Sequence, residues 1–167
     1  VHDLLAPLPD DAVLVGNSDH RYFAITYAQQ VQGRRPDVDY LATDLVGVDW
    51  YRARLDDDFV LDQAIRNGTF HLSVFFDRVL AQGRPTFVTH FLHPEMGEIW
   101  RIYPYGMAFR VRPPSAGGLG LRRIFRQNRR LLRRFTMEPR PGAPETSWSH
   151  FLLSEYARMW RTLGKRL

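Results

Sequence analysis

Residues 12–51 decide the fold, and they read AVLVGNSDHRYFAITYAQQVQGRRPDVDYLATDLVGVDWY. The stretch opens on a short apolar run, Ala12 to Val15, which is typical of a buried strand. The polar cluster Gly16-Asn17-Ser18-Asp19 follows, and its residue types form turns and cap helices. A buried strand that leads through a polar turn into a helix is the first half of a βαβ unit.

The second half of the unit is a helix that leads into another strand. The apolar residues of this helix recur at helical spacing and predict one buried stripe, formed by Phe23, Ala24, Tyr27, Ala28 and Val31. The helix is expected to run from Asp19 to Gln32, because Gly33 stands where a helix C-terminus favours a left-handed residue. Val38 to Ala42 then predicts a strand parallel to the first, since the connection is long enough for a right-handed crossover.

The chain that follows predicts two further helical segments. Asp49 is a candidate cap for a helix that begins at Trp50. Phe59 to Arg66 is expected to add another turn or two, which Asn67-Gly68 ends. Thr69 is expected to cap a longer helix, whose buried side would be Leu72, Phe75, Phe76, Val79 and Leu80.

The run from Thr86 to His90 predicts the third strand, so the expected order is β-α-β-α-β. Two further runs, Glu98 to Tyr103 and Met107 to Arg112, flank Pro104-Tyr105-Gly106 and predict an antiparallel hairpin at the edge of the sheet. We therefore expect an α/β fold with a three-stranded, mostly parallel sheet, an antiparallel edge hairpin and a helical C-terminal extension.

The extension is set apart by the proline- and glycine-rich sequence of residues 113–118. The predicted division is an α/β sandwich domain over residues 1–114 and a linker with two helices over residues 115–167. The first of these helices is rich in arginine. Ser147 is the expected cap of the second, whose buried side would be Trp148, Phe151, Leu152, Tyr156, Met159, Trp160 and Leu163.

Composition narrows the class of protein. The length of 167 residues fits one domain with its own core, and no apolar run is long enough to cross a bilayer. Val1 to Pro9 lacks the basic start and the small-residue cleavage site of a signal peptide. Without cysteine, neither a disulfide framework nor a thiolate metal site is possible. The formal net charge of +5 comes almost wholly from arginine, and the excess lies after Leu121.

Polar side chains follow all three strands that are predicted to be parallel. They are Asn17, Asp19 and His20 after the first strand, Asp44 after the second, and His90 and His93 after the third. Open α/β sheets bind ligands in the crevice beyond the carboxyl ends of their strands. These residues therefore form a candidate site for a sugar hydroxyl, a phosphate-linked head group or an acceptor peptide. The competing interpretation is structural: Asp19 caps its helix and Asp44 orders its loop.

Other chemistries lack the motifs that they need. His90-x-x-His93-x-Glu95 holds residue types that bind metals, but Pro94 prevents the helical geometry that places two histidines on one face. No Gly-x-Ser-x-Gly elbow is present to support a hydrolase triad. The glycines of residues 117–120 precede no Lys-Ser/Thr pair of a phosphate loop. We therefore predict no metal and no cofactor.

The arginine-rich helix allows three interpretations. Its apolar stripe is Leu121, Ile124, Phe125, Leu131, Leu132 and Phe135. Its basic side is Arg122, Arg123, Arg126, Arg129, Arg130, Arg133 and Arg134. The basic side is a candidate for contact with an anionic membrane surface or with nucleic acid. In the third interpretation the apolar stripe packs on the domain and arginine covers the outside. Asn128 interrupts the stripe, which favours packing against an irregular segment.

Residues 17–51 also carry the motif of a family of multi-spanning membrane proteins. In that family a strand ends in a sequence similar to T-N-G-D-N-D-T-F-P-L-W-Y-L-Q, followed by E-V-E-G-x-R-P-D-V and, after a second strand, by L-L-N-T-x-W-Y. The residues that match without a gap are Asn17, Asp19, Phe23, Tyr27, Gln29, Val31, Gly33, Arg35, Pro36, Asp37, Val38, Leu45, Trp50 and Tyr51. Arg21 stands where the family has a second acidic residue, and Ala24 where it has proline.

The family that the chain resembles is of glycosyltransferase type, and its animal members are protein O-mannosyltransferases. The resemblance implies an extramembrane domain on the extracytoplasmic face, with membrane spans that precede Val1. In such enzymes the sugar comes from a lipid-linked donor, and the catalytic acidic residues belong to loops of the membrane part. The domain is then expected to be non-catalytic. It would bind or orient the acceptor, a protein or a glycan, or cover the active site, with the membrane-embedded part of the same protein as its partner.

Two other functions stay open on the sequence. A free-standing enzyme that binds a sugar or a nucleotide sugar would use the same crevice at the carboxyl ends of the strands. A basic adaptor would bind nucleic acid through residues 122–134. Contact with an anionic membrane ranks above nucleic acid, because the family that the chain resembles is a membrane family.

Overall fold

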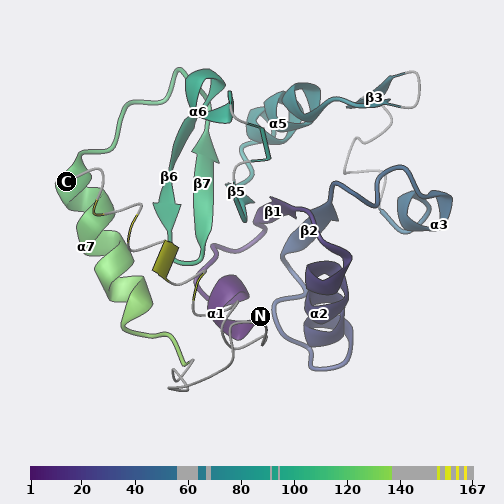
Figure 1. Cartoon of the computed structure of the whole chain (residues 1–167), viewed down its shortest axis with the longest axis horizontal. Coiled ribbons are helices and arrows are strands. Elements are labelled where there is room, and N and C mark those ends of the chain that lie inside the picture. Colours follow the sequence, from purple (N-terminus) through teal and green to yellow (C-terminus); the bar gives the residue numbers. More distant parts are fainter. Residues whose placement is uncertain are drawn as a thin grey trace.

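A five-stranded sheet forms the centre of the molecule. The structure, a computed structural model, describes residues 1–55, 64–66, 69–90, 92–93 and 95–136 together with positions 154, 157, 158, 161 and 164. The strands lie in the order β2-β1-β5-β7-β6 (Figure 1). Their bounds are Val13–Gly16 for β1, Asp39–Ala42 for β2, Thr86–Val88 for β5, Arg101–Tyr105 for β6 and Ala108–Arg112 for β7.

The sheet is mixed, with parallel strands at its core. β1 runs parallel to β2 on one side and to β5 on the other. β7 pairs antiparallel with β5, and β6 pairs antiparallel with β7. The predicted α/β class, with parallel core strands and an antiparallel hairpin at the edge, is confirmed. The sequence predicted a three-stranded sheet with an antiparallel hairpin at its edge. In the structure β7 of the hairpin pairs with β5, so the sheet has five strands.

Helices cover the sheet on both sides. Their bounds are His2–Leu5 for α1, Asp19–Gln30 for α2, Asp49–Arg52 for α3, Leu72–Ala81 for α5, Met96–Ile99 for α6 and Leu121–Leu132 for α7. α2 packs against β2 and α5 against β5, and Figure 1 shows these two helices on opposite sides of the sheet. Val13, Leu14 and Val15 of β1 are fully buried, because a strand covered on both faces has no solvent side.

The buried side of α2 differs from the predicted stripe. The side chains that this helix buries are Tyr22, Ile25 and Ala28. Three residues of the predicted stripe are instead exposed: Phe23 at 57%, Tyr27 at 54% and Val31 at 67%. Both sets have helical spacing, so tertiary contacts decide between them. Tyr22 packs edge-on against Tyr51, with the ring centroids 5.1 Å apart. At the other end of the helix Gln29 donates to the carbonyl oxygen of Arg35 at 2.9 Å.

The segment before α5 also differs from the prediction. Ile65–Arg66 (β3) and Thr69–Phe70 (β4) form an antiparallel pair outside the main sheet. His71, and not Thr69, occupies the cap position of α5. In the sequence the two strands are separated by Asn-Gly, which is typical of short hairpins. The prediction treated this dipeptide only as the end of a helix.

At the amino ends of the parallel strands, the guanidinium of Arg35 holds the N-terminal segment in place by hydrogen bonds. Arg35 Nη1 donates to the carbonyl oxygens of Leu5 at 3.0 Å and Leu8 at 2.6 Å, and Nη2 donates to that of Pro9 at 2.8 Å. Nε and Nη2 also donate to the two carboxylate oxygens of Asp37, at 2.9 and 2.6 Å. This hydrogen-bonded partner lowers the pKa of Asp37 to about 2. Arg35 therefore fixes the segment that follows α1.

A second arginine joins three strands at the same end of the sheet. Arg84 Nη2 donates to Asp39 Oδ2 at 2.6 Å and to Asp11 Oδ1 at 2.9 Å. Arg84 precedes β5, Asp11 precedes β1 and Asp39 begins β2. The Arg84 side chain is only 14% exposed. The Arg84 guanidinium is thus enclosed at the start of the sheet, while the Asp11 side chain is 71% exposed.

α7 packs across the β6–β7 hairpin through a buried amide. Asn128 Oδ1 accepts from Gly106 N at 2.8 Å, and Nδ2 donates to the carbonyl oxygens of Pro104 at 2.8 Å and Ile124 at 2.9 Å. Ile124 is buried in a small hydrophobic cluster with Tyr103. The prediction that Asn128 meets an irregular segment is confirmed, because Gly106 lies in the hairpin turn.

Several predicted features lie outside the described residues. They are the helical turn over 59–63, the dipeptide at 67–68, and the buried side of the last helix, Trp148, Phe151, Leu152, Tyr156, Met159, Trp160 and Leu163. The division of the chain at residue 114 stays a prediction. Across the described residues, none of the helices combines the length and the apolar character that a membrane span requires.

Candidate functional site

The carboxyl ends of the parallel strands lie side by side. Gly16, the last residue of β1, is paired with Ala42, the last residue of β2. Backbone hydrogen bonds continue this order beyond the strands, from Thr43 N to Gly16 O at 2.8 Å and from Thr89 N to Val15 O at 2.9 Å. The segments that leave the strands at this one edge are 17–21, 43–44 and 89–90.

The order of the sheet reverses at β1. From β1 the chain crosses to β2 on one side, and from β2 it returns past β1 to β5 on the other side. The chain thus leaves β1 toward β2 and leaves β5 toward β6, in opposite directions along the sheet. These two connections therefore do not fill the same space. Open α/β sheets bind ligands at this kind of position. The polar turn of residues 17–19 lies there.

Asp44 holds this turn in an unusual backbone conformation. Ser18 has φ +88° and ψ +113°, in a region that residues other than glycine rarely adopt. Its N–H donates to Asp44 Oδ2 at 2.8 Å, which places the carboxylate at the positive end of the α2 dipole. Ser18, and not Asp19, occupies the cap position of α2. Asp19 Oδ1 instead accepts from the N–H of His20 at 2.7 Å, so the expected capping role of Asp19 is wrong.

Thr89 connects three polar side chains at the end of β5. Its Oγ1 accepts from Arg21 Nη1 at 3.0 Å and lies 2.8 Å from His90 Nδ1. Its carbonyl oxygen accepts from Arg158 Nη2 at 3.1 Å. Thr89 itself is only 2% exposed. The Thr89–His90 pair resembles a hydroxyl with its base, but the buried hydroxyl is out of reach of a substrate, so Thr89 positions the groups around it.

Gly16 makes this close arrangement possible. A Cβ at this position would lie 2.7 Å from Thr89 Oγ1 and 2.8 Å from Tyr40 Oη. Both distances are shorter than any ordinary van der Waals contact. A glycine at the end of a central strand often marks such a close approach. Both hydroxyls therefore lie over the strand at a residue that has no side chain.

Tyr40 places a protonated hydroxyl beneath the turn. Its Oη lies 3.4 Å from Asn17 O, to which it donates. Burial raises the pKa of Tyr40 to about 12, opposed by the Arg21 cation and assisted by the Asp44 carboxylate. The phenol thus stays a donor over the whole physiological pH range.

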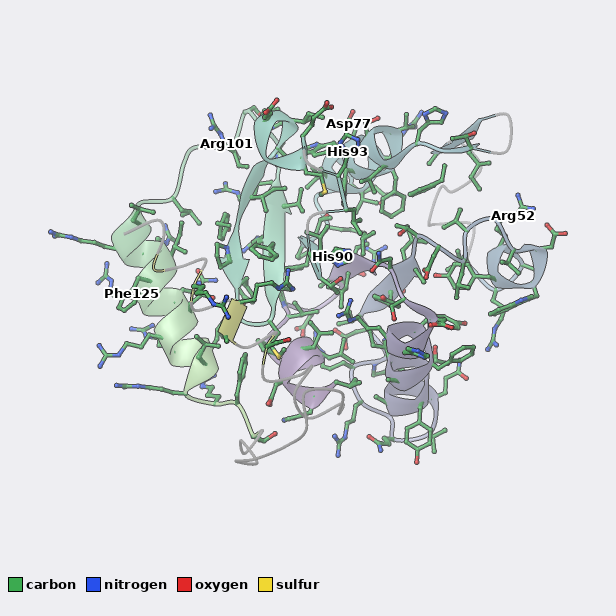
Figure 2. All side chains as sticks on the ribbon, viewed as in Figure 1. Arg52, Asp77, His90, His93, Arg101 and Phe125 are labelled. Carbon is green, nitrogen blue, oxygen red and sulfur yellow. The ribbon has the colours of Figure 1, made fainter. Side chains whose placement is uncertain are left out.

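The structure brings most of the predicted site residues together. We define the carboxyl-edge cluster as Asn17, Asp19, His20, Arg21, Asp44, Thr89 and His90. The side chains of Asp19 and His20 are 57% and 67% exposed. His93 does not join the cluster: its Nδ1 lies 3.9 Å from Glu95 Oε2, and Figure 2 shows it apart from His90, toward α5 and α6.

Sequence reasoning missed four members or neighbours of this site, which are Arg21, Tyr40, Thr89 and Arg158. Thr89 lies inside the strand predicted from Thr86 to His90, and Arg21 was visible as a departure from the motif of the family that the chain resembles. Arg158 gave no signal, because 69 residues separate it from Thr89. Its guanidinium also lies over the ring of Phe109, 5.8 Å from the centroid.

The described residues contain no group of three His, Asp or Glu side chains that is arranged to hold a metal ion. His90 interacts with Thr89, and His93 lies beside Glu95. The cluster combines exposed carboxylate and imidazole groups with a guanidinium and an amide. Such a mixture of donors and acceptors is able to exchange hydrogen bonds with hydroxyl or peptide groups. Comparisons of the chain with models of protein families, with curated proteins and with solved structures found no match.

Proposed function

We propose that this chain is a non-catalytic extracytoplasmic domain of a multi-spanning, glycosyltransferase-like membrane protein that uses a lipid-linked sugar. Its carboxyl-edge cluster binds or orients the acceptor, or covers the active site of the membrane part. The observation that carries the proposal is the parallel arrangement of β1, β2 and β5, which gathers the polar segments 17–21, 43–44 and 89–90 at one edge. That edge is where open α/β sheets bind their ligands.

The chemistry of the cluster supports binding more than catalysis. Asp19 and His20 are exposed and able to exchange hydrogen bonds with sugar hydroxyls or peptide groups. The hydroxyl of Thr89, which lies beside an imidazole, is buried. A nucleophile must reach its substrate as well as its base.

The sequence motif supports the same proposal, because its residues form two groups with different contacts. Gln29, Arg35 and Asp37 bind backbone carbonyls or one another and hold the end of α2 and the N-terminal segment. Asn17 and Asp19 lie instead in the cluster. One part of the motif thus holds the fold together, and another part lies in the polar cluster. This is expected of a domain that presents one binding site.

A second candidate is a free-standing enzyme that binds a nucleotide sugar. The observation that favours it is the cation of Arg21 at the same edge, since guanidinium groups bind phosphate. Turnover would distinguish the two candidates, because the first predicts binding alone.

Calorimetric titration of the whole chain tests the proposal. The probes are a Ser/Thr-rich acceptor peptide, mannose and a nucleotide sugar. We expect saturable binding of the peptide or of mannose, at least tenfold weaker in Asp44→Ala and unchanged in Asp77→Ala. Asp77 is an exposed acid on α5, away from the cluster (Figure 2). The absence of binding at millimolar concentration, or equal losses in both variants, would contradict the proposal. Turnover of the nucleotide sugar would support the second candidate.

A further inference from the structure

The outer side of α7 carries a continuous row of arginines. We define the arginine side as Arg122, Arg123, Arg126, Arg129, Arg130, Arg133 and Arg134, all of which are exposed. They recur along the whole helix, Leu121–Leu132, and into the turn after it. At about 1.5 Å per residue this row extends over roughly 18 Å.

No carboxylate among the described residues lies within ion-pair distance of the arginine side. The arginines that form ion pairs in the described ranges lie elsewhere. Arg35, for example, pairs with Asp37, and Arg84 pairs with Asp39. Like charges at neighbouring positions of one helix repel each other and cost stability. A row of cations that have no carboxylate partner in the described ranges therefore favours an anionic partner.

The opposite side of α7 is already used for packing. Asn128 and Ile124 are buried against the hairpin, and Leu132 packs on the same small cluster. A helix that lies in a bilayer interface inserts its apolar side, and here the middle of that side is buried at Ile124 and Asn128, while Leu121 at its start is 46% exposed. The arginine side is thus restricted to electrostatic contact, on a helix whose rotation is fixed by the three hydrogen bonds of Asn128.

The end of α7 lies beside the N-terminal segment. The Asp3 carboxylate accepts from Thr136 N at 3.0 Å and from Thr136 Oγ1 at 3.1 Å. Figure 1 shows α1 near the same end of α7. If the N-terminal segment follows a membrane span, as the proposed function has it, Arg133 and Arg134 lie at the membrane side of the domain.

We propose that the arginine side docks on an anionic lipid surface. The proposal rests on the proposed function for the direction in which the membrane lies, and on the structure for the row of exposed cations. Each basic residue near an anionic bilayer strengthens binding about fivefold, so the seven arginines together form a peripheral contact that orients the domain.

Nucleic acid fits the same surface less well. Single-strand binders interleave their cations with exposed aromatic rings. On α7 the aromatic residue is Phe125, which is partly buried.

Co-sedimentation of the whole chain with vesicles tests the docking proposal. One set of vesicles is phosphatidylcholine alone, and the other contains about a third phosphatidylglycerol. The variant replaces Arg122, Arg126, Arg129 and Arg133 by Gln, and the matched control replaces Arg34, Arg54, Arg78 and Arg101 by Gln. All eight positions are exposed, so both variants lose the same charge from the surface.

We expect binding to anionic vesicles only, weakened at least tenfold in the α7 variant and less than threefold in the control. Equal losses in the two variants, or no binding to anionic vesicles, would overturn the proposal. Tighter binding to duplex DNA or to RNA than to vesicles at equal anion concentration would replace it by the nucleic-acid alternative. The peptide and sugar titration reads a different surface, so failure here leaves the proposed function to its own test.

Discussion

The two ends of the parallel strands carry similar charged residues in different settings. At the amino end Arg35 and Arg84 are 22% and 14% exposed, and carboxylates and backbone carbonyls surround them. At the carboxyl end Asp19 and His20 are more than half exposed. The amino end therefore holds the chain together, whereas the carboxyl end presents polar groups to solvent at the point where the order of the sheet reverses. Residue type alone does not separate these roles; the contacts of the two buried guanidiniums with backbone carbonyls and carboxylates do.

The largest expected effect is the loss of the guanidinium at the amino end. Arg35→Ala leaves the carbonyls of Leu5, Leu8 and Pro9 without their charged donor, so we expect unfolding to become easier by about 3 kcal/mol. Urea denaturation measures the change, with Arg34→Ala as control because Arg34 is the exposed neighbour. Equal losses in the two variants would mean that Arg35 does not hold the N-terminal segment.

Gly16 tests how closely the carboxyl end is packed. In Gly16→Ala the new methyl group must displace Thr89 or Tyr40, which we expect to cost about 2 kcal/mol of stability. Gly47→Ala is the control, since a Cβ there meets nothing within 4 Å. Thermal unfolding of both variants measures the difference. If Gly16→Ala is as stable as Gly47→Ala, Thr89 and Tyr40 pack less closely over Gly16 than described.

Asp44 tests whether a residue at the carboxyl end contributes more to ligand binding than to stability. Asp44→Ala removes the carboxylate that accepts from Ser18 N at the start of α2, with an expected loss of about 0.5–1 kcal/mol. Ligand binding should fall at least tenfold, so the effect on binding exceeds the effect on stability. Urea denaturation and calorimetry on the same sample provide both values. A loss of stability as large as that of Arg35→Ala would place Asp44 among the structural residues.

The smallest effect is expected from pH at the amino end. The folded pKa of Asp37 is about 2, below its ordinary value of 3.8, because of the Arg35 hydrogen bond. This carboxylate therefore stabilises the fold above about pH 4 and loses that contribution as the pH falls toward 2. Asp37 is 36% exposed, so solvent screening keeps the contribution below about 1 kcal/mol.

Urea denaturation of the native chain and of Asp37→Asn, at several values between pH 2 and 5, measures this contribution. The stability difference between the two proteins should shrink as the pH falls. A difference that stays constant over this range would show that Arg35 binds the neutral side chain equally well.

The sequence was sufficient for the α/β class, for the parallel core strands and for the antiparallel hairpin, but not for the order of the strands in the sheet. Polar turns after apolar runs located the ends of β1 and β2, and with them Asn17, Asp19 and Asp44. The rotation of α2 was not predictable, because two stripes had the same period and Tyr51 selected the one with Tyr22. Arg158 was also out of reach, since local patterns carry no information about a contact across 69 residues.

The most direct test of the account is a nuclear magnetic resonance titration of the isotope-labelled chain with the Ser/Thr-rich peptide and with mannose. We expect the amide signals of residues 16–21, 43–44 and 89–90 to move in a saturable way, while those of residues 34–39 at the opposite end stay in place. Asp44→Ala should abolish the movement. Signals that move mainly at the amino end, or none that move with either probe, would contradict the claim that the carboxyl edge is the binding site.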